Sequence, residues 1–110
     1  MKLKQVAKEY YSSHDYKNLR DETKAHYQYC LTNALATSVD GVVIGEGDVT
    51  KMSTKQAKLS YDLWCDRGIS TANHIMAVTR ILLNYAVRME HCNINPFATV
   101  RRRATQPRKV

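Results

Sequence analysis

The sequence predicts an all-α domain, a four-helix orthogonal bundle with one glycine-rich insert. In four separate segments, apolar residues recur at the spacing of one buried helix face. The exception is residues 37–52, between the second and third helices, which hold three of the four glycines and a short apolar run. With 110 residues, 44% of them hydrophobic, the chain is long enough for one modest core, which we assign to residues 1–100.

The first two helices are predicted from apolar stripes that are bounded by turn-forming residues. The first stripe ends near residues 12–15 and consists of Leu3, Val6, Ala7 and Tyr10. The second helix begins between Asn18 and Asp21, either of which could cap it. Its expected buried residues are Tyr27, Cys30, Leu31, Ala34 and Leu35. Three further tyrosines look peripheral: Tyr11, Tyr16 and Tyr29.

The insert and the third helix carry clear local signals. Asp40-Gly41 followed by an apolar run suggests a turn between extended segments, such as a small hairpin. Ser53 and Gln56 have the spacing of a capping box at a helix start. This third helix should end at Gly68, with the glycine in the left-handed conformation. Its expected buried residues are Ala57, Trp64 and either Ser60 or Tyr61.

The last helix is expected to be the longest. Ser70 or Thr71 would cap it, and Asn93 with Asn95-Pro96 would end it, because a residue before proline disfavours the helical conformation. The buried stripe should contain Ala72, Ile75, Met76, Thr79, Leu82, Leu83, Ala86 and Met89.

Positive charge is concentrated at the C-terminal end of the chain. The net charge is +7, but residues 101–110 hold five basic residues and no acidic one, so residues 1–100 carry only +2. A local positive patch favours a polyanionic partner, of which nucleic acid is the commonest, although a solvated terminus is the alternative. We expect residues 101–110 to form a basic linker that contains Arg101, Arg102, Arg103, Arg108 and Lys109.

Neither a metal site nor a cofactor site is predicted. Cys30, Cys65 and Cys92 are odd in number and widely spaced, which favours free thiols in a reducing compartment. His26 and His74 are expected on exposed helical faces, and we identify no serine, cysteine or carboxylate as an obvious catalytic partner of a histidine. No apolar run is long enough to cross a bilayer, and the N-terminus lacks a signal peptide, so we expect a cytoplasmic protein.

Polar residues near the starts of the second and fourth helices are the candidate DNA-binding residues. They are Arg20, Thr23, Lys24, Tyr27, Thr71, Asn73, His74 and Arg80, together with the basic residues of 101–110. If the two helix edges lie side by side, Asn73 and Arg80 would read base edges, while Thr23, Lys24 and the arginines of the linker would hold phosphates. Ordinary helix capping also explains residues of these types, and Asp21 and Glu22 weaken a phosphate role for the start of the second helix.

Several short motifs follow one another along nearly the whole chain. They are Tyr10-Tyr11, Thr23 with Tyr27, Trp64, Arg67-Gly68, Thr71-Ala72-Asn73, Tyr85-Ala86, Asn95-Pro96 and Pro107-Arg108-Lys109. Each motif alone is weak, but the ordered set resembles the N-terminal core-binding domain of phage integrases, the tyrosine recombinases. The glycine-rich insert departs from the shortest versions of that domain.

The resemblance implies a SAM-like fold that clamps and orients double-stranded DNA at core-type attachment sites during site-specific recombination. In that family the catalytic residues are an arginine, a His-x-x-Arg motif and a nucleophilic tyrosine, all in a C-terminal domain. Neither His74 nor His91 begins a His-x-x-Arg motif. The chain is therefore expected not to be an enzyme by itself. The expected partners are DNA, a catalytic domain after residue 110 and further copies of the integrase on DNA.

Two other classes of protein remain open. The first is a helical protein–protein interaction module whose basic tail is incidental. The second is a helix-turn-helix regulator, which is disfavoured because no tight turn joins two short helices in the expected way.

Overall fold

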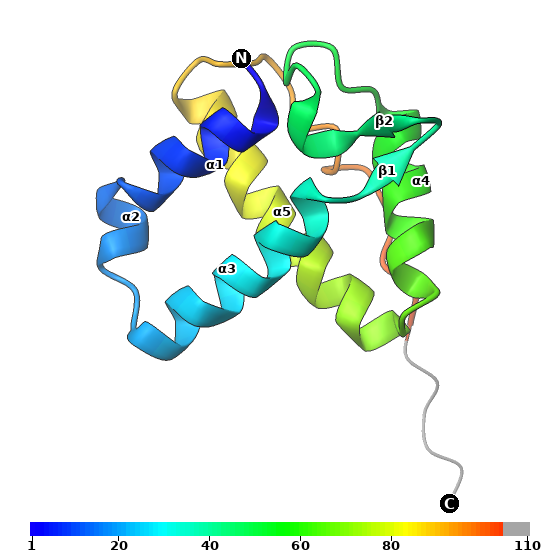
Figure 1. Cartoon of the computed structure of the whole chain (residues 1–110), viewed down its shortest axis with the longest axis horizontal. Coiled ribbons are helices and arrows are strands. Elements are labelled where there is room, and N and C mark those ends of the chain that lie inside the picture. Colours follow the sequence, from blue (N-terminus) through cyan, green and yellow to red (C-terminus); the bar gives the residue numbers. More distant parts are fainter. Residues whose placement is uncertain (105–110) are drawn as a thin grey trace, which may run out of the picture.

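Helix α5 (Ile69–Arg88) is the element around which the chain is arranged in the computed structural model, which describes residues 1–104. It contacts α1 (Leu3–Tyr11), α3 (Asp21–Leu35) and α4 (Thr54–Cys65). Figure 1 shows α5 crossing behind α3, with α1 on one side and α4 on the other. These are the four main helices of the described residues, and the prediction of a mostly helical domain is confirmed.

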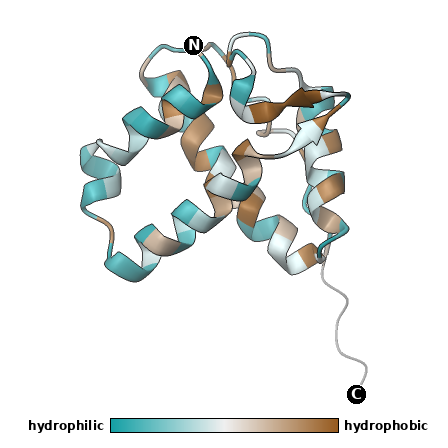
Figure 2. Cartoon of the chain, viewed as in Figure 1, coloured by the Kyte–Doolittle hydropathy of each residue, from teal (hydrophilic) through white to brown (hydrophobic). Residues whose placement is uncertain are grey.

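The central position of α5 follows from a wide apolar face. Its eight expected core residues are all buried except Met89: Ala72, Ile75, Met76, Thr79, Leu82, Leu83 and Ala86. Val78 and Tyr85 are buried as well and widen the face. In Figure 2 hydrophobic residues accordingly follow α5 through the middle of the molecule.

Both predicted ends of α5 are wrong. The N-cap is Gly68, with φ 128° and no side-chain capping bond, so the glycine begins α5 and neither Ser70 nor Thr71 caps it. The helix ends at Arg88, where Glu90 takes the left-handed conformation (φ 63°) and the amide of His91 donates to the carbonyl of Ala86. Met89 is 46% exposed because the helical spacing that would bury it has already ended.

Helices α1 and α3 are joined by a short helix, α2 (His14–Lys17), in a stretch that the sequence marks as a turn. Ser13 caps α2, and its hydroxyl also donates to the carbonyl of Tyr10. The side chain of Tyr16 is buried against Tyr10, so the prediction that it is peripheral is wrong. Arg20 is the N-cap of α3 and makes no side-chain capping bond, so neither Asn18 nor Asp21 is the cap.

The glycine-rich insert folds as a small hairpin, as expected. Strands β1 (Ser38–Val39) and β2 (Val42–Val43) pair antiparallel across Asp40-Gly41, and a 3-10 helix, η1 (Ile44–Glu46), follows. A Cβ atom at Gly45 would lie 2.7 Å from the carbonyl oxygen of Leu35, so this contact between η1 and α3 requires glycine. Val39 of β1 and Ile44 of η1 are the side chains of these elements that are buried in the core.

Helix α4 begins at the predicted capping box. The Ser53 hydroxyl accepts from the amide of Gln56 at 3.1 Å, and the Gln56 side chain accepts from the amide of Ser53 at the same distance. Ser60 and Tyr61 are both buried, along with Ala57 and Trp64.

Residues 95–103, called here the C-terminal segment, pack across α4 and α5. Phe97 is fully buried and Val100 is 4% exposed, so this segment completes the core. The Asn95 side chain donates to the carbonyl of Arg80 at 3.2 Å and to Oδ1 of Asn84 at 2.9 Å. In Figure 1 the segment runs beside α4 toward the start of α5. The first residues of the predicted linker are therefore in contact with the helical domain.

Candidate nucleic-acid interface

The two helix edges that the sequence singles out meet at a pair of histidines. His26 of α3 and His74 of α5 lie edge to face, with ring centroids 5.3 Å apart and ring planes perpendicular. Both side chains are exposed, as predicted. Because residues 21 and 69 begin α3 and α5, this contact brings the polar first halves of both helices to one place on the surface.

On α3, the candidate residues form a partly exposed edge. Arg20 is exposed, while Thr23, Lys24 and Tyr27 are half-buried. The hydroxyl of Tyr16 donates to the carbonyl of Lys24 at 3.3 Å, which ties this turn of α3 to α2. Lys24 is therefore a cation on a fixed stretch of backbone.

On α5, Asn73 faces the C-terminal segment. Its Oδ1 accepts from the Tyr61 hydroxyl at 2.6 Å, and its Nδ2 donates to the carbonyl of Arg103 at 3.1 Å. The amide of Arg103 in turn donates to the Tyr61 oxygen at 2.7 Å. Thr71, two residues earlier, is half-buried. Asn73 thus has intramolecular partners for both ends of its side-chain amide.

Arg80 also faces inward. Its Nε donates to the carbonyl of Phe97 at 2.9 Å, and Nη2 donates to the carbonyl of Val100. Burial lowers the pKa of this guanidinium, and the nearby charge of Arg102 lowers it further. The position that the sequence assigns to a base-reading arginine is therefore occupied by one that holds the C-terminal segment on α5.

The arginines at 101–103 differ in whether they pair with a carboxylate. All three are exposed. Arg103 pairs with Asp62 of α4 at 2.8 Å, while Arg101 shares a surface concavity of about 330 Å³ with Lys58 of α4. The candidates Arg108 and Lys109 lie outside the described residues.

Lys58 is a candidate residue that the sequence did not reveal. It lies on α4, for which the sequence indicates only an exposed helical position. The C-terminal segment folds back onto α4, and this long-range contact alone brings Thr99 and Arg101 to the same concavity as Lys58. No local spacing of residues encodes that proximity.

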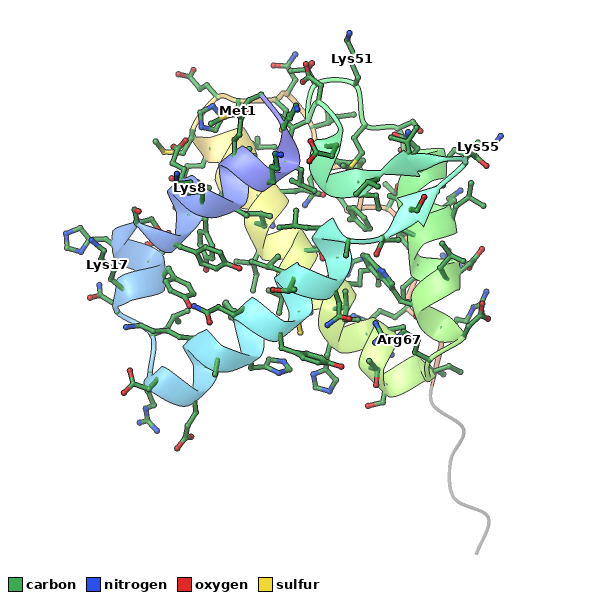
Figure 3. All side chains as sticks on the ribbon, in the orientation of Figure 1. Met1, Lys8, Lys17, Lys51, Lys55 and Arg67 are labelled. Carbon is green, nitrogen blue, oxygen red and sulfur yellow. The ribbon has the colours of Figure 1, made fainter. Side chains whose placement is uncertain are left out.

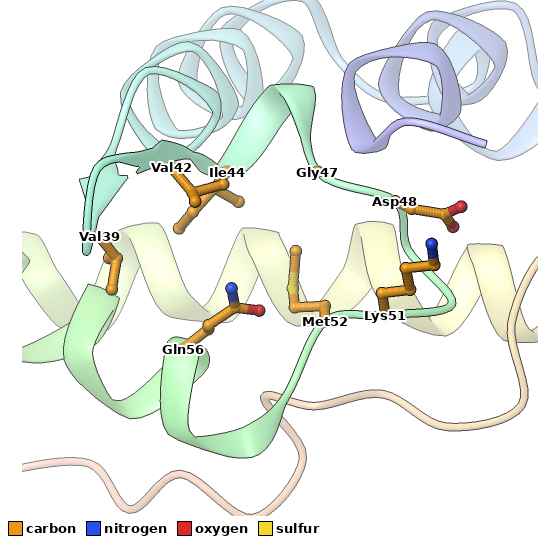
Figure 4. A pocket seen from close by; sticks show the side chains of 8 residues that line it. All are labelled: Val39, Val42, Ile44, Gly47, Asp48, Lys51, Met52 and Gln56. Atoms are coloured by element: carbon orange, nitrogen blue, oxygen red, sulfur yellow. The ribbon is translucent and has the colours of Figure 1, made fainter.

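A separate apolar pocket of about 200 Å³ lies between the hairpin and the start of α4. Figure 4 shows Val42, Ile44 and Met52 around its interior, with Asp48 and Lys51 at one end. The same hairpin leaves Val42 and Val43 exposed, at 45% and 40%. This pocket and the exposed valines form an apolar surface on one side of the hairpin, while Ser38, Val39 and Asp40 line a second concavity together with Arg103.

Among residues 1–104, no three His, Cys, Asp or Glu side chains are arranged to hold a metal ion. Within the same range, no helix has the length and apolar content needed to cross a bilayer. Cys30 and Cys92 are buried free thiols, and Cys65 is a half-buried one. Sγ of Cys30 lies 3.7 Å from Nε2 of His26, one helical turn away, so the expectation that no cysteine pairs with a histidine is wrong. Burial raises the pKa of the Cys30 thiol, which disfavours the nucleophilic thiolate.

Comparison of the chain with protein-family models, curated proteins and solved structures finds no match.

Proposed function

We propose that this chain is the core-binding module of a phage or prophage integrase, with the orthogonal SAM-like arrangement of that domain. It binds double-stranded DNA and orients it for strand cleavage by a catalytic domain of the tyrosine-recombinase type. Further copies of the same integrase would assemble on the DNA.

One observation carries this proposal. His26 contacts His74, and the neighbouring residue, Asn73, bonds to the backbone of Arg103. Two consecutive residues of α5 therefore link the α3 edge on one side with the basic residues 101–103 on the other. Polar and cationic residues from three separate parts of the chain are linked in this way through α5, and such a set of residues suits the phosphate backbone of a duplex.

The candidate residues have distinct roles in this proposal. Arg20, Thr23, Lys24 and the arginines at 101–103 contact phosphates, with Arg108 and Lys109 adding positive charge from the sequence that follows. Tyr27 and His74 border the surface, and Thr71 lies in the first turn of α5, where Gly68 leaves the helix amides without a side-chain cap.

Asn73 and Arg80 act differently from the base-reading role that the sequence favoured. Their donors are engaged with backbone carbonyls of the C-terminal segment. In the proposal they therefore hold that segment against α5.

The test is binding to a fluorescein-labelled duplex, measured by anisotropy over a series of KCl concentrations. Counterion release predicts an affinity that falls several-fold when the salt concentration is doubled. Lys24→Ala should weaken binding to all duplexes and reduce the salt slope by about one. A protein that binds no duplex even at low salt would not have this function.

A second candidate function is a helical protein–protein interaction module. The apolar pocket and the exposed Val42 and Val43 favour it, because apolar surface of this kind is common where proteins associate. This function predicts association that is insensitive to salt and lost in Val42→Asp, with no binding to DNA.

A further inference from the structure

We infer that Lys58, Arg101 and Arg103 form a binding site for a phosphate of the DNA backbone, and that Tyr61 and Asn73 are positioning residues for it. This inference rests on the proposed function. It adds a site on α4, a helix that the sequence does not connect with DNA.

The surface concavity between α4 and the C-terminal segment carries positive charge. It measures about 330 Å³, and its lining includes Lys58, Thr99, Arg101, Arg103 and Asp62. Asp62 pairs with Nη2 of Arg103 at 2.8 Å. Within residues 1–104, neither Lys58 nor Arg101 forms an ion pair with a carboxylate. The charges of Arg103 and Asp62 offset each other, so Lys58 and Arg101 leave the concavity with a net positive charge.

The backbone of the C-terminal segment is fixed by hydrogen bonds from α4 and α5. Tyr61 of α4 accepts from the amide of Arg103, and Asn73 of α5 donates to its carbonyl. Arg80 holds the carbonyl of Val100 on the other side. Arg101 and Arg102 therefore lie between two anchored residues. A flexible basic tail would lose more conformational entropy on binding a phosphate than this anchored stretch.

The hydroxyl of Tyr61 links Asn73 with the backbone of Arg103. This hydroxyl donates to Asn73 at 2.6 Å and accepts from the amide of Arg103 at 2.7 Å. Burial raises the pKa of this phenol, so it stays protonated and remains a donor. Removal of this hydroxyl would therefore break the bond from α4 to the Arg103 amide and the bond that orients Asn73, and leave the Asn73 bond to the Arg103 carbonyl as the remaining anchor of that residue.

The experiment compares Lys58→Ala, Arg101→Ala and Tyr61→Phe in the full chain, by anisotropy with a labelled duplex of arbitrary sequence over a KCl series. Each alanine variant should weaken binding to any duplex and reduce the salt slope by about one. Tyr61→Phe should weaken binding, and Arg101→Ala should then have a smaller effect in the Tyr61→Phe background than in the wild type. The matched control is Lys8→Ala, which removes an exposed lysine from α1 (Figure 3) and should leave both quantities unchanged.

Tyr61 is buried, so the thermal midpoint of each variant is measured, and Asn73→Ala serves as the second positioning variant. A merely structural role would lower the thermal midpoint without changing the salt slope or the coupling to Arg101. If Lys58→Ala and Arg101→Ala bind like the wild type while Lys24→Ala weakens binding, the phosphate site is overturned and the proposed function stands. Equal effects of Lys8→Ala and Lys58→Ala would also overturn the site. If the wild type binds no duplex, the proposed function itself fails.

Discussion

The rings of Trp64 and Phe97 stack nearly parallel, with centroids 5.7 Å apart and planes inclined by 6°. Trp64 belongs to α4, and Phe97 belongs to the C-terminal segment. The indole N–H donates to the hydroxyl of Thr37 at 2.8 Å, and that hydroxyl donates to the carbonyl of Asn33 at 2.9 Å. Trp64 thus connects α4 with Thr37, just after the end of α3, and with the C-terminal segment.

Replacing Phe97 with alanine should destabilise the protein by about 3–5 kcal/mol, because a fully buried aromatic ring leaves a cavity. Urea unfolding followed by the fluorescence of Trp64, the single tryptophan, measures this change. Thr99→Ala, an exposed position in the same segment, should change the stability by no more than about 0.5 kcal/mol. Equal stabilities of the Phe97 variant and the wild type would show that the segment does not pack in the core.

Gly68→Ala should destabilise the protein by about 1–3 kcal/mol through backbone strain, because Gly68 has a φ of 128° that L-residues rarely adopt. An added Cβ meets nothing closer than the Thr71 hydroxyl at 3.9 Å, so a clash does not contribute. Urea unfolding measures the change. The comparison is Gly41→Ala in the hairpin turn, where φ is 78° and the space is open. A left-handed residue there costs about 1–2 kcal/mol. A neutral Gly68→Ala would contradict the assigned N-cap geometry.

Glu9 should contribute to the loss of stability in acid. Its carboxylate bonds to His91 at 2.9 Å and accepts from the Tyr85 hydroxyl at 3.0 Å, and these bonds lower its pKa below the ordinary 4.5. A lowered pKa in the folded state means that the unfolded chain binds the proton first as the pH falls. Stability from Glu9 is therefore present above pH 4.5 and lost as the pH falls through the folded value.

Thermal unfolding across the acid range tests this assignment. Glu9→Gln should show a shallower fall of the melting temperature with decreasing pH than the wild type. Glu46 and Asp48, whose pKa values are also lowered by hydrogen bonds from Lys4 and Thr50 respectively, retain their contributions in this variant. Glu90→Gln, at an exposed position, is the control. An unchanged acid slope in Glu9→Gln would contradict the role of the Glu9–His91 contact.

Tyr10 should make the protein less stable at high pH. Burial raises its pKa from 10.0 to about 12, so the unfolded chain releases this proton first as the pH rises. Stability from the protonated phenol is complete below pH 10 and is lost as the pH approaches 12. Tyr10→Phe should reduce the loss across that interval, as measured by urea unfolding at several pH values. Tyr29→Phe, at an exposed position, is the matched control.

Local patterns predicted the elements of this fold well where a single segment decides the outcome. Ser53 and Gln56 cap α4 with their own side chains, and Asp40-Gly41 turns the hairpin within four residues. The end of α5 depends instead on the backbone of Glu90 and on a bond from His91, for which the sequence has no strong signal. The burial of Phe97 was missed because residues 95–100 have no helical periodicity to mark a core face.

The candidate site was predicted in part for the same reason. Helical spacing correctly gave exposed positions to His26 and His74, and the contact between their helices is a tertiary outcome. The inward partners of Asn73 and Arg80 come from a segment that lies 17 to 30 residues further along the chain. Spacing along one helix cannot distinguish a polar side chain that faces DNA from one that holds a later segment.

The position of Phe97 has a consequence for protein synthesis. All of the helices described here precede residue 89, yet the core closes only when Phe97 and Val100 dock against α4 and α5. A nascent chain that has emerged only through Arg88 lacks the Phe97 ring, so the face of the Trp64 indole on which that ring stacks is left without it. Arg101 follows four residues after Phe97, between Val100 and Arg103, whose backbones are both held by hydrogen bonds. Closure of the core and placement of the first arginines are therefore one late event on the ribosome.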